Sequence, residues 1–144
     1  DQSFDVVLLA SVFTHMFPAD VENYLREIYR ALRPGGRVLA TCFLVDDKVQ
    51  EHIAAGISQF NLQPLHGYPH TWSAFRTPEM CIGHSVDNHR KAYTGAGFDL
   101  IHFCITGCWS TYKSKDTRKA EFQDIAVAQR PLPTLTTSEI KRLG

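Results

Sequence analysis

FDVVLLASVFTH, at residues 4–15, and ALRPGGRVL, at residues 31–39, are the two stretches that decide the fold of this chain. The apolar run Phe4–Ser11 predicts a strand covered on both faces, and Val38–Val45 predicts a second strand. A helix between successive parallel strands forms a right-handed crossover, so the pattern predicts an α/β fold built on a doubly wound sheet. Ligands of such sheets bind at the carboxyl ends of the strands, which directs attention to the loop Ala10–Met16.

The helix between these strands is predicted over Ala19–Leu32, where apolar residues recur every three or four positions. Pro34 and Gly35-Gly36 end it. Gly95-Ala96-Gly97 also follows a predicted helix, so both glycine clusters indicate helix ends and not phosphate-binding loops, which open helices. The remaining pattern predicts helices at Lys48–Phe60 and Val86–Thr94, strands at Phe98–Cys104 and Phe122–Arg130, and an irregular segment at Asn61–Pro78.

The composition is that of one soluble, globular unit. The 144 residues include 15 Lys and Arg and 15 Asp and Glu, so the formal net charge is zero and nothing indicates a nucleic-acid partner. The apolar runs are far shorter than the roughly 20 residues of a membrane helix, so no membrane partner is expected. The four cysteines lie mostly in apolar strand patterns, which favours free buried thiols and a cytoplasmic location.

The chain resembles the second half of a class I S-adenosylmethionine-dependent methyltransferase. The resemblance rests on FDVVLLASVFTH, which is similar to the fourth strand of that family, and on LRPGGRVL, similar to its helix-to-strand junction. Ala96–Ile101 is similar to the entry to the sixth strand and Gln123–Arg130 to the closing strand. The resemblance implies a partial Rossmann-like sheet, with strands four to seven, intervening helices and an antiparallel last strand.

The glycine-rich turn and the acidic residue through which the family binds its cofactor are absent from the sequence, and the first residue is Asp1. We therefore expect a fragment, with residues 1–130 forming the carboxyl-terminal half of a methyltransferase domain and residues 131–144 a tail or linker.

The resemblance implies S-adenosylmethionine as cofactor and assigns roles in the loop after the first strand. Ala10, Ser11 and Val12 would bind the cofactor, and His15 would face the site of methyl transfer. Methyl transfer needs mainly alignment, but an acceptor hydroxyl or amine must lose a proton, which a histidine can accept. The alternative for His15 is a structural role at the start of the following helix.

The irregular segment is the second candidate region, because a long aromatic loop in a compact domain is typical of a lid or binding loop. His70 is the second candidate base. Tyr68, Trp72 and Trp109 are candidates to enclose the acceptor, with ordinary core packing as the alternative for each.

No metal site is expected. In an extended strand, Cys104 and Cys108 would lie roughly 13 Å apart, too far for one ion. His66 and His70 would share a helix face, but Gly67 and Pro69 interrupt any helix between them.

The sequence supports an enzyme that transfers a methyl group from S-adenosylmethionine to an oxygen or nitrogen of a small-molecule substrate. The alternative is a non-catalytic half-domain that acts as a binding or interaction module. In the family the strand FDVVLLAS lies between the first and fifth strands, so one neighbour is missing here. We therefore expect self-association, such as a homodimer, through the exposed edge at Val6–Ala10.

Overall fold

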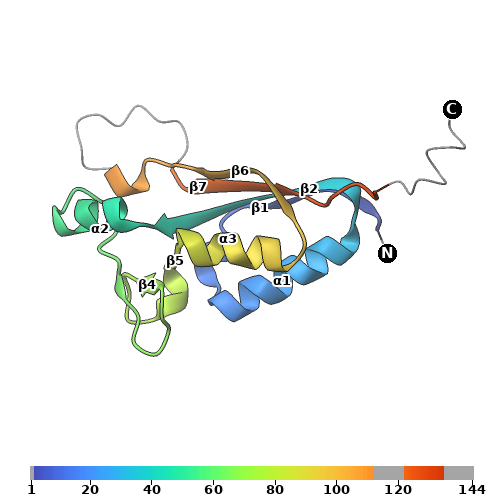
Figure 1. Cartoon of the computed structure of the whole chain (residues 1–144). Coiled ribbons are helices and arrows are strands. Elements are labelled where there is room, and N and C mark those ends of the chain that lie inside the picture. Colours follow the sequence, from blue (N-terminus) through green and yellow to red (C-terminus); the bar gives the residue numbers. More distant parts are fainter. Residues whose placement is uncertain (1, 112–121, 135–144) are drawn as a thin grey trace, which may run out of the picture.

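The structure is a computed structural model that describes residues 2–111 and 122–134 (Figure 1). The described part is a mixed α/β structure with one seven-stranded sheet and three α-helices. The strands are β1 (Phe4–Leu9), β2 (Leu32–Val45), β3 (Gln63–Pro64), β4 (Thr71–Ser73), β5 (Ile82–Ser85), β6 (Asp99–Ile105) and β7 (Asp124–Gln129). The helices are α1 (Pro18–Ala31), α2 (Asp47–Ala54) and α3 (Val86–Gly95), with 3-10 turns η1 (Phe13–His15), η2 (Pro78–Met80) and η3 (Trp109–Thr111).

The long strand β2 is the centre of the sheet. It pairs in parallel with β1, with Val7 opposite Val38, and antiparallel with β7, with Leu39 opposite Val127. β6 pairs antiparallel with β7, so four strands follow the order β1-β2-β7-β6. The parallel crossover through α1 and the antiparallel last strand are confirmed.

The far end of β2 carries a second set of strands that the sequence did not predict. β5 pairs in parallel with Phe43–Val45, and β4 and β3 continue outward from β5 in antiparallel pairs. The prediction that Asn61–Pro78 is irregular throughout was therefore wrong, because strands of two to four residues are too short to show a period. A Cβ on Gly83 would lie 2.8 Å from Leu62 Cδ1 and 3.1 Å from Val45 Cγ2, so this close packing favours glycine.

Two of the three predicted helices are confirmed within one residue at each end, and the third is shorter than predicted. α2 ends at Ala54 and not at Phe60. Gly56 has a φ of +70°, a left-handed conformation that helices do not continue through. After it, the Phe60 ring makes an edge contact with Phe43 near the end of β2.

One face of the sheet packs against α1 and α3, which lie side by side beneath it in Figure 1. The prediction that the first strand is covered on both faces was wrong. Phe4, Val6 and Leu8 are 56%, 64% and 65% exposed, whereas Val7 and Leu9 contact the core on the helical side. On the opposite face, Phe43 and Val45 at the far end of β2 pack in a second cluster with Val49 of α2 and Trp109 of η3. The main core consists of Phe13, Val21, Leu25, Ile28, Leu32, Val38, Ala40, Cys42, Leu44, Tyr93, Phe98, Ala126 and Ala128.

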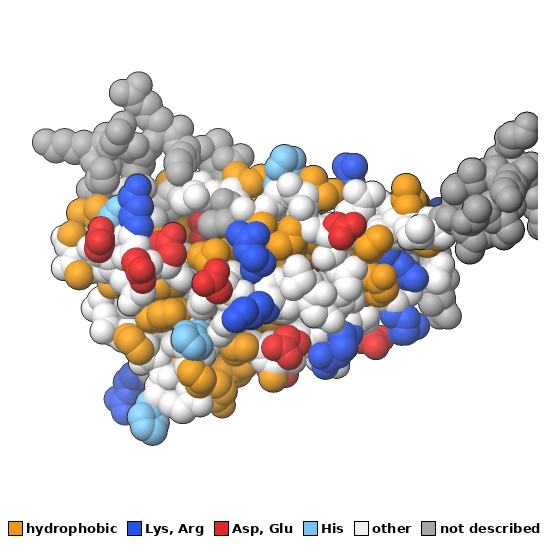
Figure 2. Space-filling model, viewed as in Figure 1, with side chains coloured by type: hydrophobic (Ala, Val, Ile, Leu, Met, Phe, Trp, Pro, Cys, Tyr) orange, Lys and Arg blue, Asp and Glu red, His pale blue; other side chains and the backbone are white. Residues whose placement is uncertain are grey.

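Charged side chains of both signs are interspersed over the helical face, and several acidic ones gather at the end that carries α2 (Figure 2). Within the described part of the chain, no helix is both long and apolar enough to cross a membrane.

A buried carboxylate joins the end of β2 to the segment that follows β6. Asp124 is 1% exposed, and its Oδ2 accepts hydrogen bonds from the Leu44 amide at 2.8 Å and Trp109 Nε1 at 2.7 Å. Its Oδ1 accepts a third from the Gly107 amide at 2.8 Å. Trp109 is itself completely buried, in a second core cluster with Phe43 and Leu62.

We expect Asp124→Ala to lower the free energy of unfolding by about 3 kcal/mol or more, because three buried donors lose their acceptor. Urea unfolding followed by circular dichroism measures the change. Asp99→Ala, at an exposed position on β6, is the matched control and should change stability by less than about 0.5 kcal/mol. Equal losses for the two variants would contradict the structural role of Asp124.

The open face and free edge of β1 generate a second prediction. β1 pairs only with β2 among the described strands, so its other edge has unpaired amides and carbonyls. We expect the chain to self-associate there and Val6→Lys to reduce the association measured by light scattering. Leu132→Lys replaces an equally exposed apolar residue outside β1 and should leave association unchanged. A monomer at high concentration for the unaltered chain would contradict this expectation.

Candidate functional site

The loop after β1 lies at the carboxyl ends of β1 and β2, and Ser11 is its most constrained residue. Ser11 has a φ of +57°, in the left-handed region that non-glycine residues rarely adopt. Its amide donates to Thr41 Oγ1 at 2.8 Å and its hydroxyl to Gln123 Oε1 at 3.0 Å, while its carbonyl accepts from Thr14 Oγ1 at 2.9 Å. These three bonds hold a backbone conformation that is costly by itself.

A shallow cavity of about 370 Å³ opens beside this loop. Thr41 donates its hydroxyl hydrogen to Gln123 Oε1, so Ser11, Thr41 and Gln123 form a connected set of polar groups in a wall that also includes Phe122 and Ile125. Ala10 and Ser11 line the cavity, whereas Val12 packs against the α1–α3 core.

His15 is exposed at the end of the same loop, and one of its ring nitrogens already makes a hydrogen bond. Nδ1 lies 2.6 Å from the backbone oxygen of Glu79. Because a carbonyl oxygen only accepts hydrogen bonds, Nδ1 carries the hydrogen and the neutral ring has its lone pair on Nε2. The contact therefore fixes both the orientation of the ring and the nitrogen that can accept a proton.

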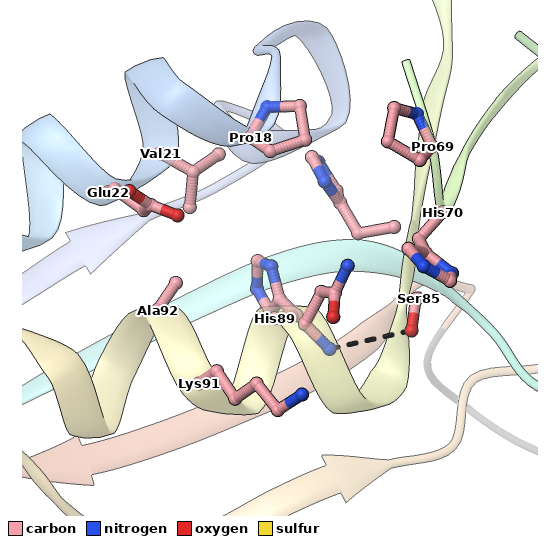
Figure 3. A pocket seen from close by; sticks show the side chains of 11 residues that line it. Pro18, Val21, Glu22, Pro69, His70, Ser85, His89, Lys91 and Ala92 are labelled. Atoms are coloured by element: carbon pink, nitrogen blue, oxygen red, sulfur yellow. Dashed lines mark hydrogen bonds between the residues drawn. The ribbon is translucent and has the colours of Figure 1, made fainter.

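Tyr68 and His70 belong to the segment between α2 and β5 and lie over the start of α1. The Tyr68 ring stacks on Phe17 at 4.5 Å between centroids. His70 has a φ of +59°, and its carbonyl accepts from the Ser85 amide at 3.0 Å. In Figure 3, Pro69 and His70 lie across a cavity of about 260 Å³ from the amino-terminal turn of α1.

The same cavity contains two buried histidines that sequence reasoning missed. His84 Nε2 lies 2.9 Å from the Phe13 carbonyl and therefore donates to it, and the His84 and His89 rings are 5.1 Å apart. His89 projects from α3 toward α1 (Figure 3). The sequence did contain a signal for the burial of His89, because it lies four residues before Tyr93 and so on the same face of a predicted helix.

Both buried histidines are held neutral. Burial lowers the pKa of His84, and its hydrogen bond to the Phe13 carbonyl opposes this shift. Burial, with a smaller contribution from neighbouring His84, lowers the pKa of His89 well below its usual range. The pair therefore cannot bind protons near neutral pH without a rearrangement of the core.

The two tryptophans lie in different surroundings. Trp72 is half-buried on β4 and lines the largest of the described cavities, of about 620 Å³. Trp109 is completely buried, and its indole nitrogen donates to Asp124, so its ring is part of the core rather than of a cavity wall.

Cysteines and histidines do not assemble into a metal centre within the described ranges, where no group of three or more His, Cys, Asp or Glu side chains could hold an ion. Cys42, Cys81 and Cys108 are buried. Burial raises the pKa of the Cys81 thiol to about 11, so this thiol stays protonated at neutral pH.

The buried histidines predict an acid-sensitive fold. The unfolded chain binds protons at these residues below the ordinary pKa of 6.5, whereas the folded chain does not. The free energy of unfolding is therefore highest above about pH 6.5. It decreases as the pH falls below this value, by up to roughly 1.4 kcal/mol per pH unit for each histidine. His89→Phe should weaken this dependence between pH 7.5 and 5, measured by urea unfolding, and the exposed control His66→Phe should not. An unchanged slope for His89→Phe would contradict the interpretation.

Comparisons with known proteins agree with this fold. Residues 1–40 match the family model described as a methyltransferase domain. Among solved structures, a SAM-dependent methyltransferase from Methanosarcina mazei is 17% identical, with a TM-score of 0.59 over 92% of this chain and 62% of its own. A protein from Pyrococcus horikoshii OT3 is 12% identical, with a TM-score of 0.56 over 90% of this chain and 53% of its own.

A structure of PigF with SAH is 17% identical, with a TM-score of 0.50 over 90% of this chain and 32% of PigF. The chain thus spans about three fifths or less of the length of these structures. It has the class I SAM-dependent methyltransferase fold, matched to a portion of larger chains.

Proposed function

We propose that this chain is the carboxyl-terminal half of a class I S-adenosylmethionine-dependent methyltransferase that acts on an oxygen or nitrogen of a small molecule. The observation that carries the proposal is the loop Ala10–Met16, which ends β1 at the carboxyl edge of the sheet and presents His15 there. In open α/β sheets, ligands bind at this edge. The parallel pairing of β1 with β2 and the antiparallel β7 match what the resemblance implies for the fourth, fifth and closing strands.

The residues beside Ser11 suit one side of a cofactor site. Ala10 and Ser11 would hold part of S-adenosylmethionine, which supplies an electrophilic methyl group when bound. The cavity beside them is open and polar on one wall, where Thr41 and Gln123 fix the Ser11 backbone. The other contacts to the cofactor would come from the part of the longer relatives that this chain does not match.

His15 is proposed as the base that accepts the acceptor's proton. Its Nδ1 hydrogen is held by the Glu79 carbonyl, so Nε2 is the nitrogen that takes the proton. Glu79 lies on η2, at the end of the segment that carries His70 and Trp72, so this hydrogen bond joins the loop to the proposed acceptor-binding segment.

Exposed apolar side chains on the sheet support the proposal that the chain is part of a larger domain. Large exposed apolar patches are unusual for an isolated monomer. Here exposed apolar residues lie on the two outer strands β1 and β6, with Phe4, Val6, Leu8, Ile101 and Ile105 all at least 37% exposed. The free edge of β1 would likewise pair with a further strand of the larger domain. These surfaces equally suit the alternative, a non-catalytic module that binds a partner chain.

Replacement of His15 tests the proposal in the full-length protein. His15→Ala should lower turnover by about 10²–10⁴-fold, the usual contribution of a general base. Affinity for S-adenosylmethionine, measured by calorimetry, should stay near the unaltered value, and the exposed control His66→Ala should change neither quantity.

Turnover near the unaltered value in His15→Ala would show that alignment alone suffices and that His15 is not the base. A full-length protein that neither binds S-adenosylmethionine nor transfers methyl groups would contradict the enzymatic proposal and support the binding module.

A further inference from the structure

The largest described cavity, of about 620 Å³, lies between α2 and the strands β3 and β4. Its volume falls within the range of about 300–1,000 Å³ that is usual for small-molecule sites. It lies beyond the carboxyl end of β2, where α2 follows, and β3 and β4 are joined to β2 through β5 (Figure 1). Its walls are Gln50, Ile53, Ala54, Gly56, Ser58, Phe60, Asn61, Leu62, Gln63, Pro64 and Trp72.

The walls of this cavity combine aromatic and aliphatic surface with uncharged polar groups. None of the described residues that line it is an Asp, Glu, Lys, Arg or His. A charged ligand would lose hydration on entering the cavity, and no charged side chain among these lining residues would compensate for that loss. A neutral ligand has no such cost. The lining therefore favours an uncharged ligand.

The apolar part of the cavity suits a flat ring. Trp72 is held on β4 by its strand pairing with Gly83, and the Phe60 ring makes edge contacts with Phe43, Phe75 and Phe122. Rings fixed in this way lose little freedom when a ligand packs against them, and aromatic pairs add to the energy of burial.

Two carboxamides at the rim are already paired with each other. Gln63 Nε2 donates to Asn61 Oδ1 at 2.7 Å. Each amide has two donors and one acceptor oxygen, so the pair keeps the Asn61 amide hydrogens and the Gln63 carbonyl oxygen for other partners. A donor and an acceptor side by side match the carbonyl and N–H of an amide group.

We propose that this cavity binds an uncharged aromatic ring with an amide substituent, and that it holds the ring of the methyl acceptor. The assignment of the ring to the acceptor rests on the proposed function; the binding of a neutral aryl amide does not. The site shares Trp72 and Gln50 with an adjoining, separate hollow lined by Asp46, Asp47 and Asp87.

Three probes of nearly equal size and different charge test the proposal on this chain. Benzamide is neutral, benzoate is an anion and benzylamine is a cation at pH 7.5. Calorimetry should show benzamide binding at least about tenfold more tightly than either ion, because only the ions lose hydration without compensation. Proton NMR should show shifts of the Trp72 indole and the Asn61 and Gln63 side-chain amides.

Variants distinguish the cavity from its surroundings. Gln63→Glu places a carboxylate at an exposed rim position, where it should not disturb folding, and should weaken benzamide and strengthen benzylamine. Asn88→Asp is the matched control, since Asn88 lines a different cavity, and should leave all three affinities unchanged. Trp72→Ala should abolish benzamide binding.

Three outcomes would overturn the proposed binding site. Tighter binding of benzylamine than of benzamide to the unaltered chain would assign the site to the neighbouring aspartates. Equal affinities, or shifts at Trp109 instead of Trp72, would also contradict it. Benzamide binding without methyl transfer in the full-length protein would retain the site and contradict only the proposed function.

Discussion

The buried carboxylate of Asp124 is the constraint that connects the main sheet to the second core cluster around Trp109. Its three hydrogen bonds link the amide of Leu44 on β2, the amide of Gly107 and the indole of Trp109. The first belongs to the main sheet, and Trp109 belongs to the core that supports α2 and the segment after it. A single side chain at the start of β7 thereby joins the main sheet to the second core cluster.

Gln123, the residue before Asp124, extends this arrangement to the proposed site. Its carboxamide oxygen accepts hydrogen bonds from Ser11 and Thr41, so adjacent residues at the start of β7 order the β1 loop on one side and the Trp109 core on the other. The left-handed conformation of Ser11 is stable because all three of its polar groups have partners. Strain in a loop is tolerated where the surrounding structure determines it this completely.

The sequence predicts the parts of the fold that repeat. The spacing of Val21, Leu25 and Ile28 identifies α1, and the alternation of Val38, Ala40 and Cys42 places one face of β2 against the helices. It cannot predict β3, β4 and β5, whose two to four residues contain no period and whose pairing depends on long-range contact. It also overestimated the burial of β1, because a run of apolar residues does not reveal whether anything covers its second face.

The site shows the same division between local and long-range information. Ala10, Ser11 and His15 could be placed from the sequence, since a loop at the carboxyl end of a strand has a predictable position. The partners that give them their chemistry lie 30 to 112 residues away, at Thr41, Glu79 and Gln123. The tautomer of His15 is the clearest case: the sequence supplies an imidazole, but only the Glu79 carbonyl determines that Nε2 is the nitrogen free to accept a proton. That carbonyl lies at the end of the segment proposed to hold the acceptor, so a movement of this segment would change the orientation of the proposed base as well as the shape of the pocket. In the proposed mechanism, one hydrogen bond would therefore couple acceptor binding to proton transfer.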